Sequence, residues 1–273
     1  ALHAVPAAQI VGHRMVWSLV FVGLLFAFKS RWSGFYRAAK NKKILVIYLA
    51  AGTILTLNWF IYVWAVNAGH VVETALGYFI NPLVYVLLGI LFLSEKLRLW
   101  QWVAVGAAAA GVLFLTVVYG SLPWIALALA FSFGFYGWVK KMAPLNALDG
   151  LFLETGLLFL PAMFFLLYQE QGGVGALGHA GFSPSILLIF TGVATGLPLL
   201  LFSAAAQKIP LTTLGILQYI APTLQFLLGV FLYGEAFNQA RLFGFSLIWL
   251  ALIIYSIENV VERRKANALQ YAN

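Results

Sequence analysis

The sequence predicts an all-α integral membrane protein, built as an inverted-repeat helical bundle. Its 273 residues are 63% hydrophobic and only 9% charged, whereas soluble domains are about one quarter charged. Apolar runs of about 20 residues, long enough to cross a bilayer, recur from one end of the chain to the other. A repeated motif in a single register then indicates how the helices are organised.

The repeated motif is an apolar helix that carries proline, glycine and glutamate at fixed positions. Its two copies are related by an offset of 140, as in the pairs Pro82 and Pro222, Gly89 and Gly229, and Glu95 and Glu235. Membrane helices resemble one another in general, which is the alternative explanation. Agreement of three residue types in one ungapped register favours an internal duplication instead.

Nine apolar segments are long enough to span a bilayer. They are expected at about 8–28, 44–67, 72–93, 100–118, 122–139, 150–168, 185–206, 211–232 and 241–259. The offset of 140 leaves the segment at 122–139 without a counterpart. We therefore expect a bundle of the ten-helix type whose first helix is missing, with nine helices present. A protein that naturally has nine helices is the alternative.

The repeats divide the chain into three parts. We expect a first repeat at 1–120 that lacks its first helix, a second repeat at 121–261, and a basic tail at 262–273. Because five helices per repeat is an odd number, the two repeats would cross the membrane in opposite orientations. Inverted repeats of this kind are a common architecture of secondary transporters.

The basic residues indicate the orientation in the membrane. One side receives 14 of the 16 Lys and Arg residues, namely Lys29, Arg31, Arg37, Lys40, Lys42, Lys43, Lys96, Arg98, Lys140, Lys141, Lys208, Arg263, Arg264 and Lys265. Arg241 lies on the other side, and Arg14 lies inside a predicted helix. Since cytoplasmic loops are rich in Lys and Arg, we expect the loop at 29–43 and the C-terminus to be cytoplasmic.

Several classes of function lack the residues they need. The sequence contains no cysteine, and its four histidines show no metal-ligand spacing, so we expect no metal or cofactor. Asp149 is the only aspartate, and no Ser-His-Asp set can be assembled. The formal charge of +8 follows membrane topology, so the expected partners are the lipid bilayer and a small-molecule substrate, without nucleic acid. We do not expect an enzyme. A membrane-embedded enzyme and a non-transporting scaffold are the alternatives.

Arg14 and Glu154 are the first candidate site residues. Charged side chains inside a membrane are costly and usually face a cavity or a partner. The two residues differ in number by 140, so they occupy equivalent positions in the two repeats. Each is expected to bind one charge of a polar substrate, or the two bind each other. The alternatives are that Arg14 extends toward the outer headgroups and that Glu154 lies at a cytoplasmic helix end.

Two further groups of polar residues complete the predicted site. Asn58 and Tyr62 lie one helical turn apart and are expected on one face, where Asn58 either bonds to a neighbouring helix or lines a pore. Pro82 and Pro222 each remove a backbone donor and are expected to act as hinges. The polar residues around the two prolines are expected to form a substrate site at the middle of the membrane; they are Tyr78, Asn81, Gln218, Tyr219 and Gln225.

Five stretches carry a family resemblance. They are HRMVWS at 13–18, NWFIYVWAVN at 58–67, ETALGYFINPLV at 73–84, LALAFSFGFYGWVKK at 127–141 and LGILQYIAPTLQFLL at 214–228. Together they resemble the RarD-like branch of the EamA-type drug/metabolite transporter superfamily. This resemblance implies a ten-helix inverted-repeat carrier in the bacterial inner membrane.

We therefore predict a secondary transporter of a small organic metabolite, acting as an exporter by alternating access. Arg14 would orient an anionic group of the substrate, and the polar residues around the two prolines would line a central cavity.

Overall fold

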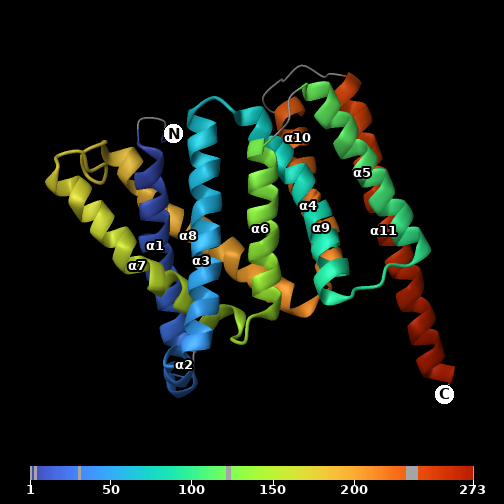
Figure 1. Cartoon of the computed structure of the whole chain (residues 1–273), viewed down its shortest axis with the longest axis horizontal. Coiled ribbons are helices and arrows are strands. Elements are labelled where there is room, and N and C mark those ends of the chain that lie inside the picture. The colour runs from blue at the N-terminus through green and yellow to red at the C-terminus, as the bar shows by residue number, and fades with distance from the viewer. Residues whose placement is uncertain (1, 3–4, 30–31, 121–123, 232–238, 273) are drawn as a thin grey trace. The chain divides into compact units, whose positions relative to one another are not determined.

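A computed structural model of the chain describes residues 2, 5–29, 32–120, 124–231 and 239–272, and within these ranges the regular structure is entirely helical (Figure 1). The helices are α1 (Ala7–Lys29), α2 (Trp32–Ala39), α3 (Lys42–Asn67), α4 (Val71–Leu93), α5 (Leu99–Tyr119), α6 (Trp124–Met142), α7 (Ala147–Gln171), α8 (Phe182–Lys208), α9 (Leu211–Gln218), α10 (Ile220–Phe231) and α11 (Gln239–Ala272).

Seven helices in the described ranges are long and apolar enough to cross a membrane; they are α1, α3, α4, α5, α7, α8 and α11. The predicted class, an all-α membrane helical bundle, is confirmed. Two of the nine expected segments do not correspond to any of these seven helices. The segment at 122–139 corresponds to α6, whose last turn carries Lys140 and Lys141 and is therefore less apolar. The segment at 211–232 is divided between α9 and α10.

The interruption between α9 and α10 has a local cause at Pro222. Proline has no N–H to donate to the carbonyl four residues earlier, that of Gln218, and its ring crowds that carbonyl. The N–H of Tyr219 donates to Ile216, three residues back, which tightens the chain at this point. The corresponding Pro82 lies inside α4, which continues through it. Of the two prolines expected to distort their helices, only the second coincides with a break.

Two segments outside the expected spans are also helical. The predicted loop at 29–43 contains α2, in which Phe35 is buried and Arg37 is exposed. Helix α11 continues well beyond the expected end at 259 and includes most of the predicted basic tail, because Glu, Arg, Lys and Ala are good helix formers.

The chain forms two compact units. Unit 1 comprises residues 1–70 and 135–209, and unit 2 comprises residues 71–134 and 210–273. In both units helices begin at positions that differ by 140. Unit 1 contains the pairs Ala7 with Ala147 and Lys42 with Phe182, and unit 2 contains Val71 with Leu211 and Leu99 with Gln239. Each unit therefore contains elements from both halves of the sequence.

Two close helix contacts at glycines in unit 1 involve residues that are related by the same offset of 140. A Cβ atom on Gly52 of α3 would lie 2.6 Å from the Leu158 side chain on α7, and one on Gly192 of α8 would lie 2.4 Å from the Trp17 backbone on α1. Next to Trp17, Ser18 donates a hydrogen bond to the Gly192 carbonyl, and Ser18 and Leu158 differ by 140. This exchange is the pattern expected of two repeats related by an internal twofold axis.

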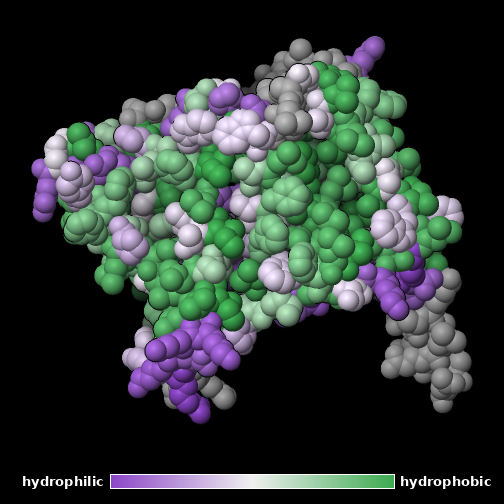
Figure 2. All heavy atoms as spheres, viewed as in Figure 1, coloured by the Kyte–Doolittle hydropathy of each residue, from purple (hydrophilic) through white to green (hydrophobic). Residues whose placement is uncertain are grey.

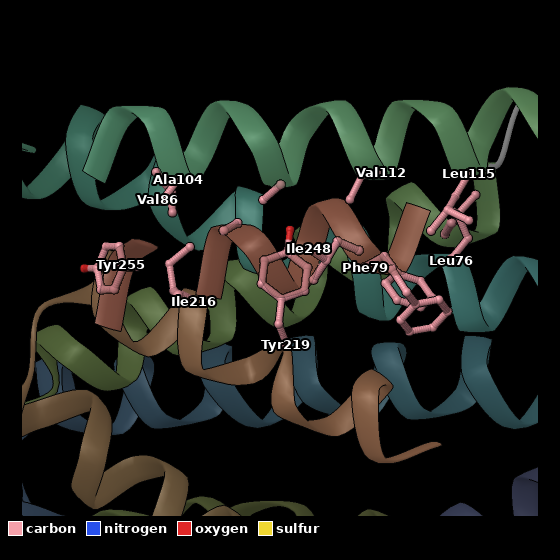
Figure 3. Close-up of a cluster of buried hydrophobic side chains, with 14 residues drawn as sticks. Leu76, Phe79, Val86, Ala104, Val112, Leu115, Ile216, Tyr219, Ile248 and Tyr255 are labelled. Atoms are coloured by element: carbon pink, nitrogen blue, oxygen red, sulfur yellow. The ribbon is translucent and has the colours of Figure 1, made fainter. Parts of the chain in front are cut away.

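Unit 2 has an apolar core formed by α4, α5, α6, α9 and α11. Leu76, Phe79, Val112, Ile248 and neighbouring side chains are buried together there (Figure 3). Helices α5 and α11 approach each other closely, since a Cβ atom on Gly111 would lie 2.8 Å from the Gly244 carbonyl. Small residues allow this close approach between membrane helices.

Hydrophilic side chains lie at both ends of unit 1, and a basic cluster gathers at one of them (Figure 2). Figure 2 shows hydrophilic side chains gathered over α2 and the start of α3, where Arg37, Lys40, Lys42 and Lys43 are exposed. Apolar side chains cover the length of α3 beyond that point in the same view. This distribution suits helices whose middle lies in hydrocarbon and whose basic ends lie at a membrane surface.

Candidate functional site

Arg14 is held between two other helices of unit 1. Its Nε donates a hydrogen bond of 3.1 Å to Oγ1 of Thr195 on α8, and its guanidinium carbon lies 4.3 Å from the centre of the Trp59 ring on α3. An arginine over a tryptophan face gains a cation–π interaction that strengthens when the pair is desolvated. The side chain is half-buried.

The direction of the Arg14 side chain follows from the packing of α1 on α8. The backbone contact of Gly192 with Trp17 and the contact of Gly196 with Phe21 show that the two helices run parallel. Thr195 therefore lies beyond Trp17, and Arg14 reaches it by extending toward the Lys29 end of α1. Side chains on a helix normally tilt the other way, toward its N-terminus. This direction does not fit the alternative in which Arg14 reaches for headgroups at the Ala7 end.

Glu154 forms a buried ion pair with Lys140, one of the basic residues expected on the cytoplasmic side. Its Oε2 accepts a hydrogen bond of 2.9 Å from Nζ of Lys140 on α6, and both side chains are only 1% exposed. The partner of Glu154 in this structure is Lys140, whereas the sequence left open either a substrate charge or Arg14 as its partner. Lys140 is buried, unlike Arg37, Lys40, Lys42 and Lys43. The short turn between α6 and α7 makes these helices neighbours, but the sequence alone does not show which of Lys140 and Lys141 faces inward.

Two tyrosine rings and two glycines complete the surroundings of the ion pair. The Lys140 ammonium lies 5.3 Å from the centre of the Tyr48 ring and 5.8 Å from that of Tyr136. A Cβ atom on Gly52 would lie 3.2 Å from Cγ of Glu154, and one on Gly150 would lie 2.6 Å from the Tyr48 hydroxyl. The two glycines therefore leave the space that Glu154 and Tyr48 occupy.

The second candidate segment lies on the same side of unit 1 as Arg14. Asn58 is buried in α3, and Tyr62 is half-buried one turn later. Tyr62 packs with Trp59 against an apolar cluster that includes Val11 and Met15 of α1. Trp59, the direct neighbour of Asn58, contacts Arg14. It is not among the predicted site residues, because aromatic residues are common in membrane helices and Trp59 does not stand out in the sequence.

The residues around the two prolines form a chain of hydrogen bonds within unit 2. Asn81 of α4 donates to the side chain of Gln218 at the end of α9. Gln218 is also hydrogen-bonded to the Tyr85 side chain, and the Tyr85 hydroxyl donates to the carbonyl of Phe133 at 2.9 Å. Asn81 and Gln218, both members of the predicted set, lie together in this structure. Tyr85 was not predicted, because it lies within an apolar run of the sequence.

Other members of the predicted set are placed differently. Tyr219 is buried in the apolar core of unit 2 (Figure 3), where its hydroxyl has no hydrogen-bond partner among the described residues. Tyr78 is 39% exposed on α4. The side chain of Gln225 lies outside the part of the chain that the structure describes.

The glutamate of the repeated motif has a clear role in its first copy. Oε1 of Glu95 accepts a hydrogen bond of 2.6 Å from the N–H of Leu211, and Oε2 accepts one of 2.9 Å from the N–H of Thr212. The carboxylate therefore satisfies free donors at the start of α9 and interacts favourably with the helix dipole. Its counterpart Glu235 lies outside the described residues.

Comparisons with known proteins agree on one family. Residues 1–117 match the EamA-like transporter family. The chain is 44% identical over 262 residues to Protein RarD of Streptomyces exfoliatus, covering 96% of this chain and 83% of that protein. It is 45% identical over 271 residues to Uncharacterized transporter YojE of Bacillus subtilis strain 168, covering 98% and 90%. Protein RarD of Escherichia coli K12 is 40% identical over 266 residues, with coverage of 97% and 90%.

A crystal structure of another protein is similar to this chain with a TM-score of 0.68 and 18% identity, covering 93% of this chain and 88% of the other. At this identity the likeness concerns the fold. The apolar helices and the relatives named as transporters define a multi-pass bacterial membrane transporter. The chain belongs to the EamA-like transporter family, in its RarD-like branch, which confirms the family expected from the sequence motifs.

Proposed function

We propose that this protein is a secondary transporter of the bacterial inner membrane that exports a small organic metabolite by alternating access. Two inverted repeats, 1–120 and 121–261, would form the carrier, followed by a cytoplasmic basic tail at 262–273. The observation that carries the proposal is the arrangement at Arg14, a charged side chain within a membrane helix that extends along the helix to Thr195 and Trp59.

Arg14 is suited to bind an anionic group of the substrate. Trp59 stacks on the guanidinium and Thr195 bonds to Nε, which positions the planar guanidinium. An arginine guanidinium matches a carboxylate bidentately. Asn58 and Tyr62, which lie on one face of α3, are further proposed substrate contacts. The polar residues around Pro82 and Pro222 remain proposed contacts, with the break before Pro222 as a hinge.

The distribution of basic residues supports a cytoplasmic C-terminus. The exposed cluster on α2 and the start of α3 marks one end of unit 1, and cytoplasmic loops carry the excess of Lys and Arg. With this orientation, α1 begins outside the cell and Arg14 extends inward, away from the outer membrane surface.

The test is counterflow of candidate metabolites in proteoliposomes. Arg14→Lys should keep the protein folded but reduce exchange at least about tenfold, because an ammonium cannot form the bidentate pair. Arg14→Ala should reduce it by the same amount or more. Arg37→Ala is the matched control. Because Arg37 is exposed on α2, this variant should exchange the metabolite at the normal rate. Normal exchange by Arg14→Ala would refute the role of Arg14.

A further inference from the structure

The Lys140–Glu154 ion pair lies among contacts that tie one end of unit 1 together. Three hydrogen bonds surround the turn between α6 and α7. The carbonyl of Leu145 in this turn accepts from Nε2 of Gln207 on α8 at 2.7 Å. The hydroxyl of Tyr48 on α3 accepts from the Leu145 N–H at 3.1 Å. Nζ of Lys141 donates to the carbonyl of Ile209 at 2.6 Å. Helices α3, α6, α7 and α8 are therefore joined at this end.

A buried ion pair of this kind adds little to the stability of the folded protein. A buried pair must offset the cost of removing both charges from water, and well-packed apolar residues usually do this at least as well. Here the offset is incomplete, because Oε1 of Glu154 is buried without a hydrogen-bond partner among the described residues. An unsatisfied buried acceptor is costly in a dry protein, whereas water would satisfy it at once.

These properties suit a contact that forms and breaks. When the end is closed, the pair and the rings of Tyr48 and Tyr136 hold the Lys140 ammonium. When the end opens, both charges regain hydration, so opening costs less than separating an apolar seam of the same size. The glycines at 52 and 150 allow the close fit of the closed form.

We propose that Lys140 and Glu154 form an ionic gate at the end of unit 1 that carries the α6–α7 turn. The gate is closed in this structure and opens during the transport cycle. The inference rests on the proposed alternating-access function, but its test does not require transport. Arg14 belongs to a different part of unit 1, because Gly12 packs on Leu166 of α7 whereas Gly23 packs on Phe152. Glu154 lies near the Phe152 end of this antiparallel contact.

Ser203 provides a nearly isosteric probe of the closed gate. It is completely buried on α8, four residues before Gln207 and next to Phe202, whose ring stacks on Tyr136. The chain has no cysteine, so Ser203→Cys introduces a single thiol. A membrane-impermeant maleimide should react slowly with this thiol in the closed state.

The experiment compares labelling rates of Ser203→Cys in vesicles of both orientations. Adding Lys140→Glu or Glu154→Gln should raise the rate at least about tenfold, because an uncompensated buried charge strongly disfavours the closed state. The rise should occur only when the reagent is on the side of the α6–α7 turn. Glu170→Gln and Lys208→Met, which change exposed charges, are matched controls and should leave the rate unchanged.

A charge-exchanged variant separates gating from damage to the fold. Lys140→Glu combined with Glu154→Lys restores an ion pair at the same place and should return labelling toward the slow rate. If a single variant does not fold, this double variant decides the outcome by itself. Slow labelling of folded single variants, fast labelling of the double variant, or acceleration from both sides would overturn the gate. Failure of metabolite counterflow with the labelling pattern intact would instead count against the proposed function alone.

Discussion

The contact between α8 and α1 predicts a large difference between two glycines at equivalent repeat positions. A methyl group on Gly192 would lie 2.4 Å from both the carbonyl carbon and the carbonyl oxygen of Trp17. Backbone atoms, unlike a side chain, cannot relieve the contact by changing rotamer, so the two helices must separate. A methyl group on Gly52 would lie 2.6 Å from Cδ1 of Leu158, the end of a side chain that can change rotamer.

The magnitudes follow from three contributions. Overpacking costs about 1–3 kcal/mol, and replacing glycine by alanine within a helix returns about 1 kcal/mol. Separation at Gly192 also weakens the hydrogen bond from Ser18, worth about 1 kcal/mol. Gly192→Ala should therefore lower the free energy of unfolding by about 1–3 kcal/mol, since the last two contributions cancel. Gly52→Ala should change it by less than about 1 kcal/mol, because the end of Leu158 can move and Cγ of Glu154, at 3.2 Å, needs to shift only slightly.

Reversible unfolding of the purified protein in mixed micelles, followed by tryptophan fluorescence, measures both values. Gly106→Ala is a control for helix propensity, since no atom lies within 4 Å of the added Cβ, and it should be neutral or stabilising by up to about 1 kcal/mol. Equal losses at Gly52 and Gly192, or none at Gly192, would refute the distinction between backbone and side-chain contact.

Two other predictions concern the start of α9 and the topology. Glu95→Ala should lower the free energy of unfolding by about 1–2 kcal/mol through loss of the helix cap, and Glu95→Gln, which keeps one acceptor oxygen, should lose less in the same unfolding assay; equal losses would argue against capping. A cysteine placed at Lys42 should react with an impermeant maleimide only from the cytoplasmic side, while His179→Cys, in the exposed segment between α7 and α8, should react only from outside. Labelling of Lys42→Cys in intact cells would overturn the proposed orientation.

The helices and their register could be predicted because they depend on patterns within the sequence. Apolar runs locate the spans, and the offset of 140 anticipates the starts of four helix pairs. The break at Tyr219 was less predictable, because Pro82 and Pro222 stand in equivalent sequence contexts and only the second coincides with an interruption. The two prolines have different surroundings in the fold; Gly215 of α9, for example, packs against the Pro82 carbonyl.

The partners of the candidate site residues were harder to predict. Arg14 and Glu154 could be selected as candidates because a charge within an apolar helix is visible in the sequence; in the structure Glu154 is buried and Arg14 is half-buried. Their partners Thr195 and Lys140 depend on how helices rotate against each other. A threonine in an apolar helix and a lysine at a helix end are both common, so neither residue stands out before the helices are packed.

The two parallel contacts in unit 1 differ in mechanical character. Where α8 rests on α1, backbone lies against backbone at Gly192 and Trp17, and a hydrogen bond from Ser18 fixes the sliding position. Where α3 rests on α7, the contacts at Gly52 are the side chains of Leu158 and Glu154, which yield to small displacements more readily than backbone does. Helices α1 and α8 should therefore move as a rigid pair that carries the Arg14–Thr195 contact unchanged, while α3 can shear past α7 and carry Trp59 toward or away from the guanidinium. One repeat-related interface is thus stiff and the other compliant, so a nearly symmetric architecture can move asymmetrically.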